Sequence, residues 1–341
     1  MSTYRAYQVT GQRQFDLVER ELVPPPYGQV RVRVLSCGVC HSDVLAVEGQ
    51  RPAPEQPVVP GHEIVGVVDA IGDGVRAWKP GDRVGIGFLG GQCNECEFCR
   101  RGDFVNCTDQ PKPGTTEDGG YAEVVYARAS GLVRVPETLT PTTAAPLLCA
   151  GVTVFNALRA TAAPSGALVA VQGIGGLGHL GVQYAKKLGY RVAAIARGAE
   201  KSELATALGA DHYIDSAAAD PGAALNALGG ATAAIATAAS GASMSPLVAG
   251  LRPRGQLIVV GVAPDPIAVN TADPILGGRS IVGSLTGSAI DNEDNLAFSV
   301  AHGISPMVEV MPFEEAPGAY ERMMSGQARF RVVLDIAGTT R

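Results

Sequence analysis

A strand, a glycine-rich turn and a helix follow one another between residues 167 and 189, and this unit restricts the fold more than any other stretch. The run 167–171 is apolar, as in a buried strand, and 179–189 has a helical pattern. Because the chain has 43 glycines, the spacing Gly-x-Gly-x-x-Gly could arise by chance. Its position between a strand and a helix makes it a dinucleotide fingerprint. We therefore predict a parallel α/β sheet whose cofactor-binding loop contains Gly173, Gly175, Gly176, Leu177 and Gly178.

The end of the next predicted strand, 191–195, bears on which dinucleotide is bound. A carboxylate there would bind the 2′-hydroxyl of NAD, but the sequence continues Ala196-Arg197-Gly198, with Lys201 close behind. Arg197 can pair with a 2′-phosphate, so NADP(H) is favoured and NAD(H) remains possible. The alternative is that Arg197 is simply solvated.

The first 150 residues have a different pattern. Residues 29–34 alternate apolar and polar side chains, a Pro-rich loop follows at 51–57, and residues 64–68 and 82–86 are further short strands. This periodicity predicts a barrel-like or sandwich domain. A chain of 341 residues is long enough for two domains.

Four cysteines lie within fifteen residues, as Cys93-x2-Cys96-x2-Cys99-x7-Cys107. Four thiolates can close around one tetrahedral Zn²⁺ and leave no open position, so we predict a structural zinc site. The alternatives are an iron–sulfur cluster, whose usual Cys-Pro ending is absent, and free thiols.

A second metal site is predicted from Cys40 and His62, which are ligand types that zinc accepts. A catalytic zinc needs a third protein ligand, and the best remaining candidate is Cys149. All seven cysteines precede residue 150, and this bunched, odd number favours metal binding over disulfides.

In these features the chain resembles the zinc-dependent medium-chain alcohol dehydrogenase family, within its bacterial and cinnamyl-alcohol-dehydrogenase-like branch. The similarity spans nearly the whole chain in family order. The matching segments are 38–43, 60–63, the four-cysteine lobe, 147–151, 173–178 and 328–334.

The resemblance implies a GroES-like β-rich catalytic domain, residues 1–149 and 286–341, and a Rossmann doubly wound domain, residues 150–285. It implies that Cys40, His62 and Cys149 are the catalytic zinc ligands. The resemblance also implies that the carboxylate of Glu63 can approach the zinc and that Asp43 orients His62. It implies that Ser42 accepts the proton of the substrate, and that His41 and Arg331 bind the cofactor. Taken singly, Ser42 and Asp43 could also be helix-capping residues, and Cys37 is interpreted as a core thiol.

The sequence departs from the family pattern in two ways, at three positions. Leu45 occupies the place of a histidine that completes a proton route in many relatives, and Val47 and Arg51 replace aromatic residues that narrow the pocket. Phe88 is then the expected aromatic wall of a roomier substrate pocket. The remaining histidines, His179, His212 and His302, are expected to be surface or helix residues.

The resemblance implies a broad-specificity oxidoreductase that interconverts primary aliphatic or aromatic alcohols and carbonyl compounds, with two zinc ions per chain. A C=C or C=N reductase and a non-catalytic cofactor-binding protein are the alternatives. The net charge of −6 gives no reason to expect nucleic acid or a membrane as partner, and no apolar run reaches the roughly 18–20 residues that span a bilayer. We expect a cytoplasmic homodimer or homotetramer, paired through the edge strand 280–284.

Overall fold

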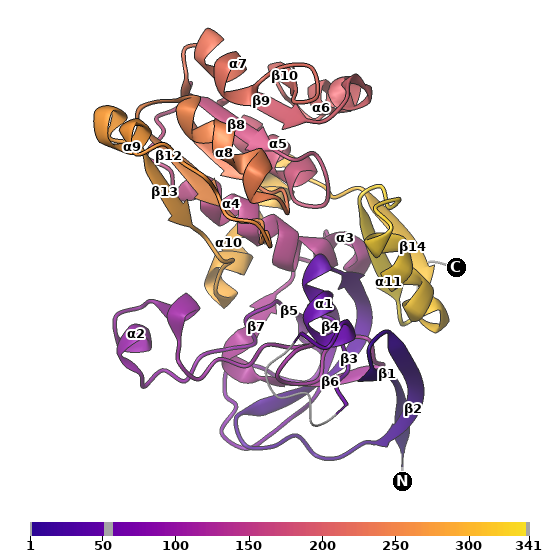
Figure 1. The fold of residues 1–341 in the computed structure, drawn as a ribbon. Coiled ribbons are helices and arrows are strands. Elements are labelled where there is room, and N and C mark those ends of the chain that lie inside the picture. Colours follow the sequence, from indigo (N-terminus) through magenta and orange to yellow (C-terminus); the bar gives the residue numbers. More distant parts are fainter. Residues whose placement is uncertain (1, 51–56, 339–341) are drawn as a thin grey trace. The chain divides into compact units, whose positions relative to one another are not determined.

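The computed structural model describes residues 2–50 and 57–338, and the chain divides into two compact units (Figure 1). The β-rich unit comprises Met1–Cys149 and Gly287–Arg341, and the Rossmann unit comprises Ala150–Thr286. The boundaries expected from the sequence differ from these at residue 286 alone. Arg51 and most of the expected loop at 51–57 lie outside the described residues.

The Rossmann unit is built on one parallel sheet of six strands in the order β10-β9-β8-β11-β12-β13. This is the doubly wound order 3-2-1-4-5-6, whose strand order reverses between β8 and β11, where a ligand binds at the carboxyl ends of the strands. The strands are β8 (Leu168–Gln172), β9 (Arg191–Ala196), β10 (His212–Asp215), β11 (Ala231–Ala236), β12 (Leu251–Val259) and β13 (Ser280–Gly283).

Helices alternate with these strands, as the periodicity predicts. They are α4 (Val152–Arg159), α5 (Gly178–Lys187), α6 (Ser202–Ala207), α7 (Pro221–Ala227), α8 (Gly241–Ala249) and α9 (Ala272–Gly277). The central strands β8 and β11 are completely buried, which explains their continuous apolar sequences.

The β-rich unit contains a two-stranded sheet and a larger, mostly antiparallel sheet. The small sheet pairs β1 (Thr3–Gly11) with β2 (Gln14–Glu21). The large sheet has the order β14-β15-β3-β4-β5-β7, with β6 also paired to β3. Its strands are β3 (Gln29–Val39), β4 (Glu63–Ile71), β5 (Arg83–Ile86), β6 (Val124–Arg128), β7 (Leu132–Arg134), β14 (Val308–Pro312) and β15 (Arg331–Asp335).

The helices of the β-rich unit are short, apart from α10. They are α1 (Val44–Val47), α2 (Glu97–Arg100), α3 (Pro141–Pro146), α10 (Ala289–His302) and α11 (Ala316–Met324), with 3₁₀ turns η1 (His41–Asp43), η2 (Phe104–Asn106), η3 (Ala129–Gly131) and η6 (Phe313–Glu315). In β3 the valines at 30, 32 and 34 are buried while the arginines between them are more exposed, as the alternation predicts.

A π-helical turn, η4 (Leu147–Gly151), follows α3 and continues into α4. Pro146 ends α3, and a proline has no amide hydrogen to donate within a helix, so the regular pattern is interrupted at this point. Single π turns are frequent at functional sites because they displace one side chain from the regular helical position. Cys149 lies in this turn.

The whole helical run, Pro141–Arg159, has 19 residues and a mean hydropathy of 1.3, enough by length and composition to cross a membrane. The expectation that no apolar segment reaches this length was therefore wrong. However, 78% of its most apolar window is buried within the fold, as in the core helix of a folded domain.

Candidate metal centre and dinucleotide site

The pairing of β3 with β4 brings the first two predicted ligands together. The strands run antiparallel with Cys37 opposite Ile64 and Gly38 opposite Glu63. Cys40 follows the end of β3, and His62 and Glu63 stand at the start of β4, so the three residues meet at one edge of the sheet. The π turn adds Cys149 to this group.

The four side chains form a compact cluster. One ligand atom from each of Cys40, His62, Glu63 and Cys149 lies within 4.8 Å of all the others, and the Cys40 and Cys149 sulfur atoms are 3.9 Å apart. Two thiolates bound to one tetrahedral Zn²⁺ at about 2.3 Å each would be about 3.8 Å apart. Nε2 of His62 is buried and has no hydrogen-bond partner among the described residues. The chemistry, the spacing and this unpartnered nitrogen all fit zinc.

Asp43 connects two of these residues. Its Oδ1 lies 3.0 Å from Nδ1 of His62, which leaves Nε2 as the ring nitrogen available to a metal. Its Oδ2 accepts hydrogen bonds from the backbone N–H of Cys40 and from the hydroxyl of Tyr121, both at 3.0 Å. The position of Asp43 beside His62 is the one that the resemblance implied.

Glu63 and Arg331 form a completely buried ion pair beside the cysteines. Burial raises the pKa of the Glu63 carboxyl to about 7, although the Arg331 guanidinium acts in the opposite direction. Arg331 also donates a hydrogen bond to the backbone oxygen of Val39 at 3.4 Å. It was assigned to the cofactor from the sequence; the structure places it among the predicted metal ligands, and its contact with a cofactor remains a prediction.

The pKa values of the two thiols in the cluster are shifted in opposite directions. A hydrogen bond from the Cys149 thiol lowers the pKa of Cys40 well below its usual value, and the same contact raises the pKa of Cys149. The lowered pKa of Cys40 favours its thiolate, which is the form that binds metals.

The other residues predicted around this site come from the segments next to it. Ser42 is half-buried in η1, and His41, beside it, is exposed. The Phe88 ring stands edge-on to the His62 ring, with their centroids 5.2 Å apart, a position consistent with a pocket wall. Val47 is completely buried against Val9 and Tyr320, so it fills core space and does not widen a pocket.

The four-cysteine lobe also gathers its sulfur atoms. The ligand atoms of Cys93, Cys96, Cys99 and Cys107 all lie within 4.8 Å of one another. Backbone N–H groups point at the sulfurs, for example from Cys96 to Cys93 at 3.3 Å, and hydrogen bonds from the backbone of Cys99 and Thr108 lower the pKa of Cys96 to about 6. The four sulfur atoms within 4.8 Å of one another fit a tetrahedral zinc, although burial raises the pKa of Cys99 to about 12.

The predicted dinucleotide loop lies between β8 and α5. Gly173 has φ +90°, and a Cβ at Gly178 would collide with the carbonyl oxygen of Gly173, so only glycine fits at position 178. His179 is completely buried in α5, with Nδ1 2.8 Å from the oxygen of Gly175, and is therefore not a surface residue. His212 lies in strand β10 and is partly exposed, whereas His302 is an exposed residue of helix α10.

Arg197 lines a pocket of about 510 Å³ at the carboxyl ends of these strands, together with Gln172 and Ser216. Lys201 is half-buried at the end of the 3₁₀ turn η5 (Ala199–Lys201). The structure also shows a carboxylate that sequence analysis missed. Asp215 ends β10 and accepts a hydrogen bond from the backbone N–H of Gly198 at 2.8 Å. Its position opposite Ala196 follows from strand pairing, which the local sequence does not reveal.

Two further side chains escaped the sequence analysis. Tyr121 binds Asp43, as described, and Asn295 on α10 donates a hydrogen bond to the backbone oxygen of Leu147, at the start of the π turn, at 2.9 Å. Both are completely buried, and no local motif marks either of them.

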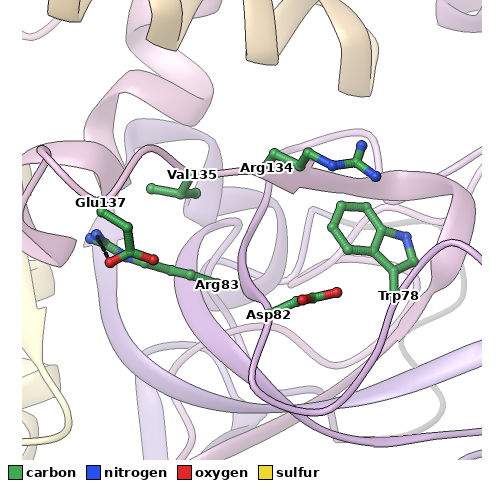
Figure 2. Close-up of a pocket in the computed structure, with 6 residues that line it drawn as sticks. All are labelled: Trp78, Asp82, Arg83, Arg134, Val135 and Glu137. Carbon is green, nitrogen blue, oxygen red and sulfur yellow. Dashed lines mark ion pairs between the residues drawn. The ribbon is translucent and has the colours of Figure 1, made fainter.

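A separate pocket of about 350 Å³ opens on the β-rich unit (Figure 2). The guanidinium of Arg134 lies 4.5 Å from the centre of the Trp78 ring, while Arg83 and Glu137 face each other with 3.6 Å between Nη1 and Oε2. None of the predicted site residues lines it.

Comparisons with known proteins agree with this geometry. Residues 26–137 match the model of the alcohol dehydrogenase GroES-like domain, and residues 176–301 match that of the zinc-binding dehydrogenase domain. The chain is 43% identical to alcohol dehydrogenase patD of Penicillium expansum over 93% of both sequences. Its fold resembles a cinnamyl alcohol dehydrogenase of Sorghum bicolor, with a TM-score of 0.90, 34% identity and 99% of each chain covered. It also resembles a Helicobacter pylori cinnamyl alcohol dehydrogenase in complex with NADP(H), with a TM-score of 0.85, 28% identity, and 98% and 99% of the chains covered.

Proposed function

The chain belongs to the zinc-dependent medium-chain alcohol dehydrogenase family and interconverts alcohols with aldehydes or ketones using a nicotinamide cofactor; from this premise we propose that catalysis depends on a zinc ion held by Cys40, His62 and Cys149. The observation that carries the proposal is the buried cluster of four ligand atoms within 4.8 Å. We propose a second, structural zinc at Cys93, Cys96, Cys99 and Cys107, which gives two zinc ions per chain.

When bound, the catalytic zinc supplies a Lewis acid that polarises a carbonyl oxygen and favours the alkoxide form of an alcohol. Asp43 keeps the proton of His62 on Nδ1, so that the other nitrogen remains free for the metal. Arg331 balances the charge of Glu63 in a buried setting, where an unpaired carboxylate would be costly. Ser42 takes the proton of the substrate alcohol, and Phe88 forms one wall of the substrate pocket.

The substrate class that we propose is primary aliphatic and aromatic alcohols and their aldehydes. NADP(H) is the proposed preferred cofactor, because Arg197 is exposed in the pocket at the end of β9 and no ion-pair partner for it exists among the described residues. Asp215 is the residue that would argue against this preference, since a carboxylate near the ribose would favour NAD. Its Oδ1 is already engaged by the backbone N–H groups of Gly198 and Ala217, at 2.8 and 2.9 Å.

We further propose that two copies pair through β13. This strand ends the six-stranded sheet, and Ile281 and Val282 on it are 45% and 40% exposed. An exposed apolar edge strand can add a strand from a second copy. Further association of two dimers would give the tetramer.

The assay for the proposal follows oxidation of NADPH and NADH with benzaldehyde and with cinnamaldehyde, and identifies the products. Faster NADPH oxidation that yields benzyl and cinnamyl alcohol is the expected result. Saturated aldehyde as the product from cinnamaldehyde would show reduction of the C=C bond and would contradict the proposed substrate chemistry. Preference for NADH would overturn the cofactor proposal alone.

A further inference from the structure

We propose that Tyr121 is a positioning residue of the metal centre, which holds Asp43 in place and through it sets both Cys40 and His62 for zinc. This inference rests on the zinc site proposed above. Tyr121 lies 78 residues from Asp43 in the sequence and contacts it through its hydroxyl group at 3.0 Å.

The first argument is that the contacts of Asp43 link two predicted ligands. One carboxylate oxygen lies 3.0 Å from Nδ1 of His62. The other accepts from the N–H of Cys40 and from the Tyr121 hydroxyl. If the hydroxyl is removed, Asp43 loses one of these contacts and can rotate, which shifts the His62 ring and the backbone at Cys40 together.

The second argument is that the backbone around Tyr121 is tied to the segment that precedes His62. Gly119 N–H donates to the Val59 oxygen at 2.7 Å, Gly120 N–H to the Gly61 oxygen at 3.0 Å, and Tyr121 N–H to the Pro60 oxygen at 2.9 Å. Tyr121 is thus fixed by its backbone to the His62 segment and by its hydroxyl to the Cys40 segment.

The third argument is packing. The Tyr121 side chain is completely buried, and a Cβ on Gly61 would lie 2.6 Å from its ring. Gly61 has φ +99°, a backbone conformation that glycine adopts easily. The absence of a side chain at Gly61 also leaves room for the Tyr121 ring. Burial and the neighbouring Asp43 raise the pKa of Tyr121 well above its usual value, so the hydroxyl keeps its proton and acts as a donor.

The test compares Tyr121→Phe with Tyr126→Phe in the full-length zinc-loaded protein. Tyr126 is a matched control because its hydroxyl also forms hydrogen bonds, with the N–H and the oxygen of Val23 at 2.9 Å. It is only partly buried, and these bonds lie at an exposed position. Zinc release to a colorimetric chelator is followed over time. Groups that orient a metal ligand typically contribute about 10- to 100-fold in metal affinity. We therefore expect Tyr121→Phe to bind one of its two zinc ions about 10-fold more weakly, which is measured as faster release of that ion to the chelator.

The zinc of the four-cysteine lobe should be released at an unchanged rate, which provides an internal control, and Tyr126→Phe should match the wild type. Adding Asp43→Asn gives a double-mutant cycle. In the Asp43→Asn background, removal of the Tyr121 hydroxyl should have little further effect on the rate of zinc release. Unchanged release of both zinc ions in Tyr121→Phe, or a fully additive cycle, would overturn the proposal. If the wild-type protein releases only the zinc of the four-cysteine lobe, the proposed catalytic zinc site is wrong, and so is this role of Tyr121.

Discussion

Cys37 and Cys40 show how strongly the surroundings of one residue type decide its chemistry. Cys37 belongs to the apolar core cluster of the β-rich unit, and burial raises the pKa of its thiol. Three residues later, Cys40 lies 3.9 Å from the Cys149 sulfur and has a lowered pKa. The interpretation of Cys37 as a core thiol is confirmed by its position.

Arg197 provides a prediction at the same scale. In Arg197→Ala, the KM for NADPH should rise about 10- to 100-fold, because charge-assisted hydrogen bonds to a 2′-phosphate contribute about 1.5–3 kcal/mol. The KM for NADH should stay within about twofold, since NADH has no 2′-phosphate. Steady-state kinetics with both cofactors measures the two values.

Arg191 is the matched control for this change. Like Arg197, it is exposed. It is the first residue of β9, whereas Arg197 follows the last residue of that strand. Arg191→Ala should leave both KM values unchanged. Equal rises in the two KM values in Arg197→Ala would contradict the proposed phosphate contact.

At the scale of single elements, the π turn η4 is the feature that most directly places a predicted ligand. Pro146 interrupts the helix, and Asn295 supports the carbonyl of Leu147 at the start of the turn. Cys149 follows two residues later. The turn and the helix that supports it therefore belong to the construction of the metal centre.

Asn295→Leu tests this support. The change keeps a similar volume but leaves the buried Leu147 carbonyl without this donor, which should cost about 1–3 kcal/mol of folding free energy. Chemical denaturation measures the loss, and the catalytic zinc should also be released faster. Asn226→Leu is the control, because the amide of Asn226 donates to the Ala249 oxygen at 3.1 Å at an exposed position and should contribute about 0.5 kcal/mol or less. Equal losses in the two variants would contradict a special role of the turn.

The elements also show what could be predicted from the sequence. The glycine loop, the four-cysteine lobe and the alternation in β3 are local signals, because spacing within a few residues decides them. The partners of Asp43 and Glu63 are not local: Tyr121 is 78 residues from Asp43, and Arg331 is 268 residues from Glu63. Such contacts follow from strand pairing and packing, so Tyr121 and Asn295 were missed and Arg331 was assigned only to the cofactor.

At the scale of the whole molecule, each unit ends its sheet with a strand that carries a partly exposed valine. Val282 on β13 and Val310 on β14 are both 40% exposed. Only β13 is proposed to pair with a second copy. This gives a test with matched positions on two edges.

Val282→Lys should weaken the dimer at least about 100-fold, because symmetry places an uncompensated charge from both copies in one interface. Val310→Lys should leave the oligomeric state unchanged. Sedimentation velocity over a range of concentrations distinguishes monomer, dimer and tetramer. Dissociation by Val310→Lys but not by Val282→Lys would contradict pairing through β13.

The most direct test of the proposed zinc mechanism is native mass spectrometry of the wild type and Cys149→Ala, combined with the benzaldehyde assay on the same samples. We expect two zinc ions per chain in the wild type, and one zinc ion with at least about 1,000-fold lower kcat/KM in Cys149→Ala, as several kcal/mol of transition-state stabilisation are lost. Cys37→Ala, the control for loss of a buried thiol, should keep both zinc ions and its activity. Full turnover by a Cys149→Ala protein that holds a single zinc ion would contradict the account.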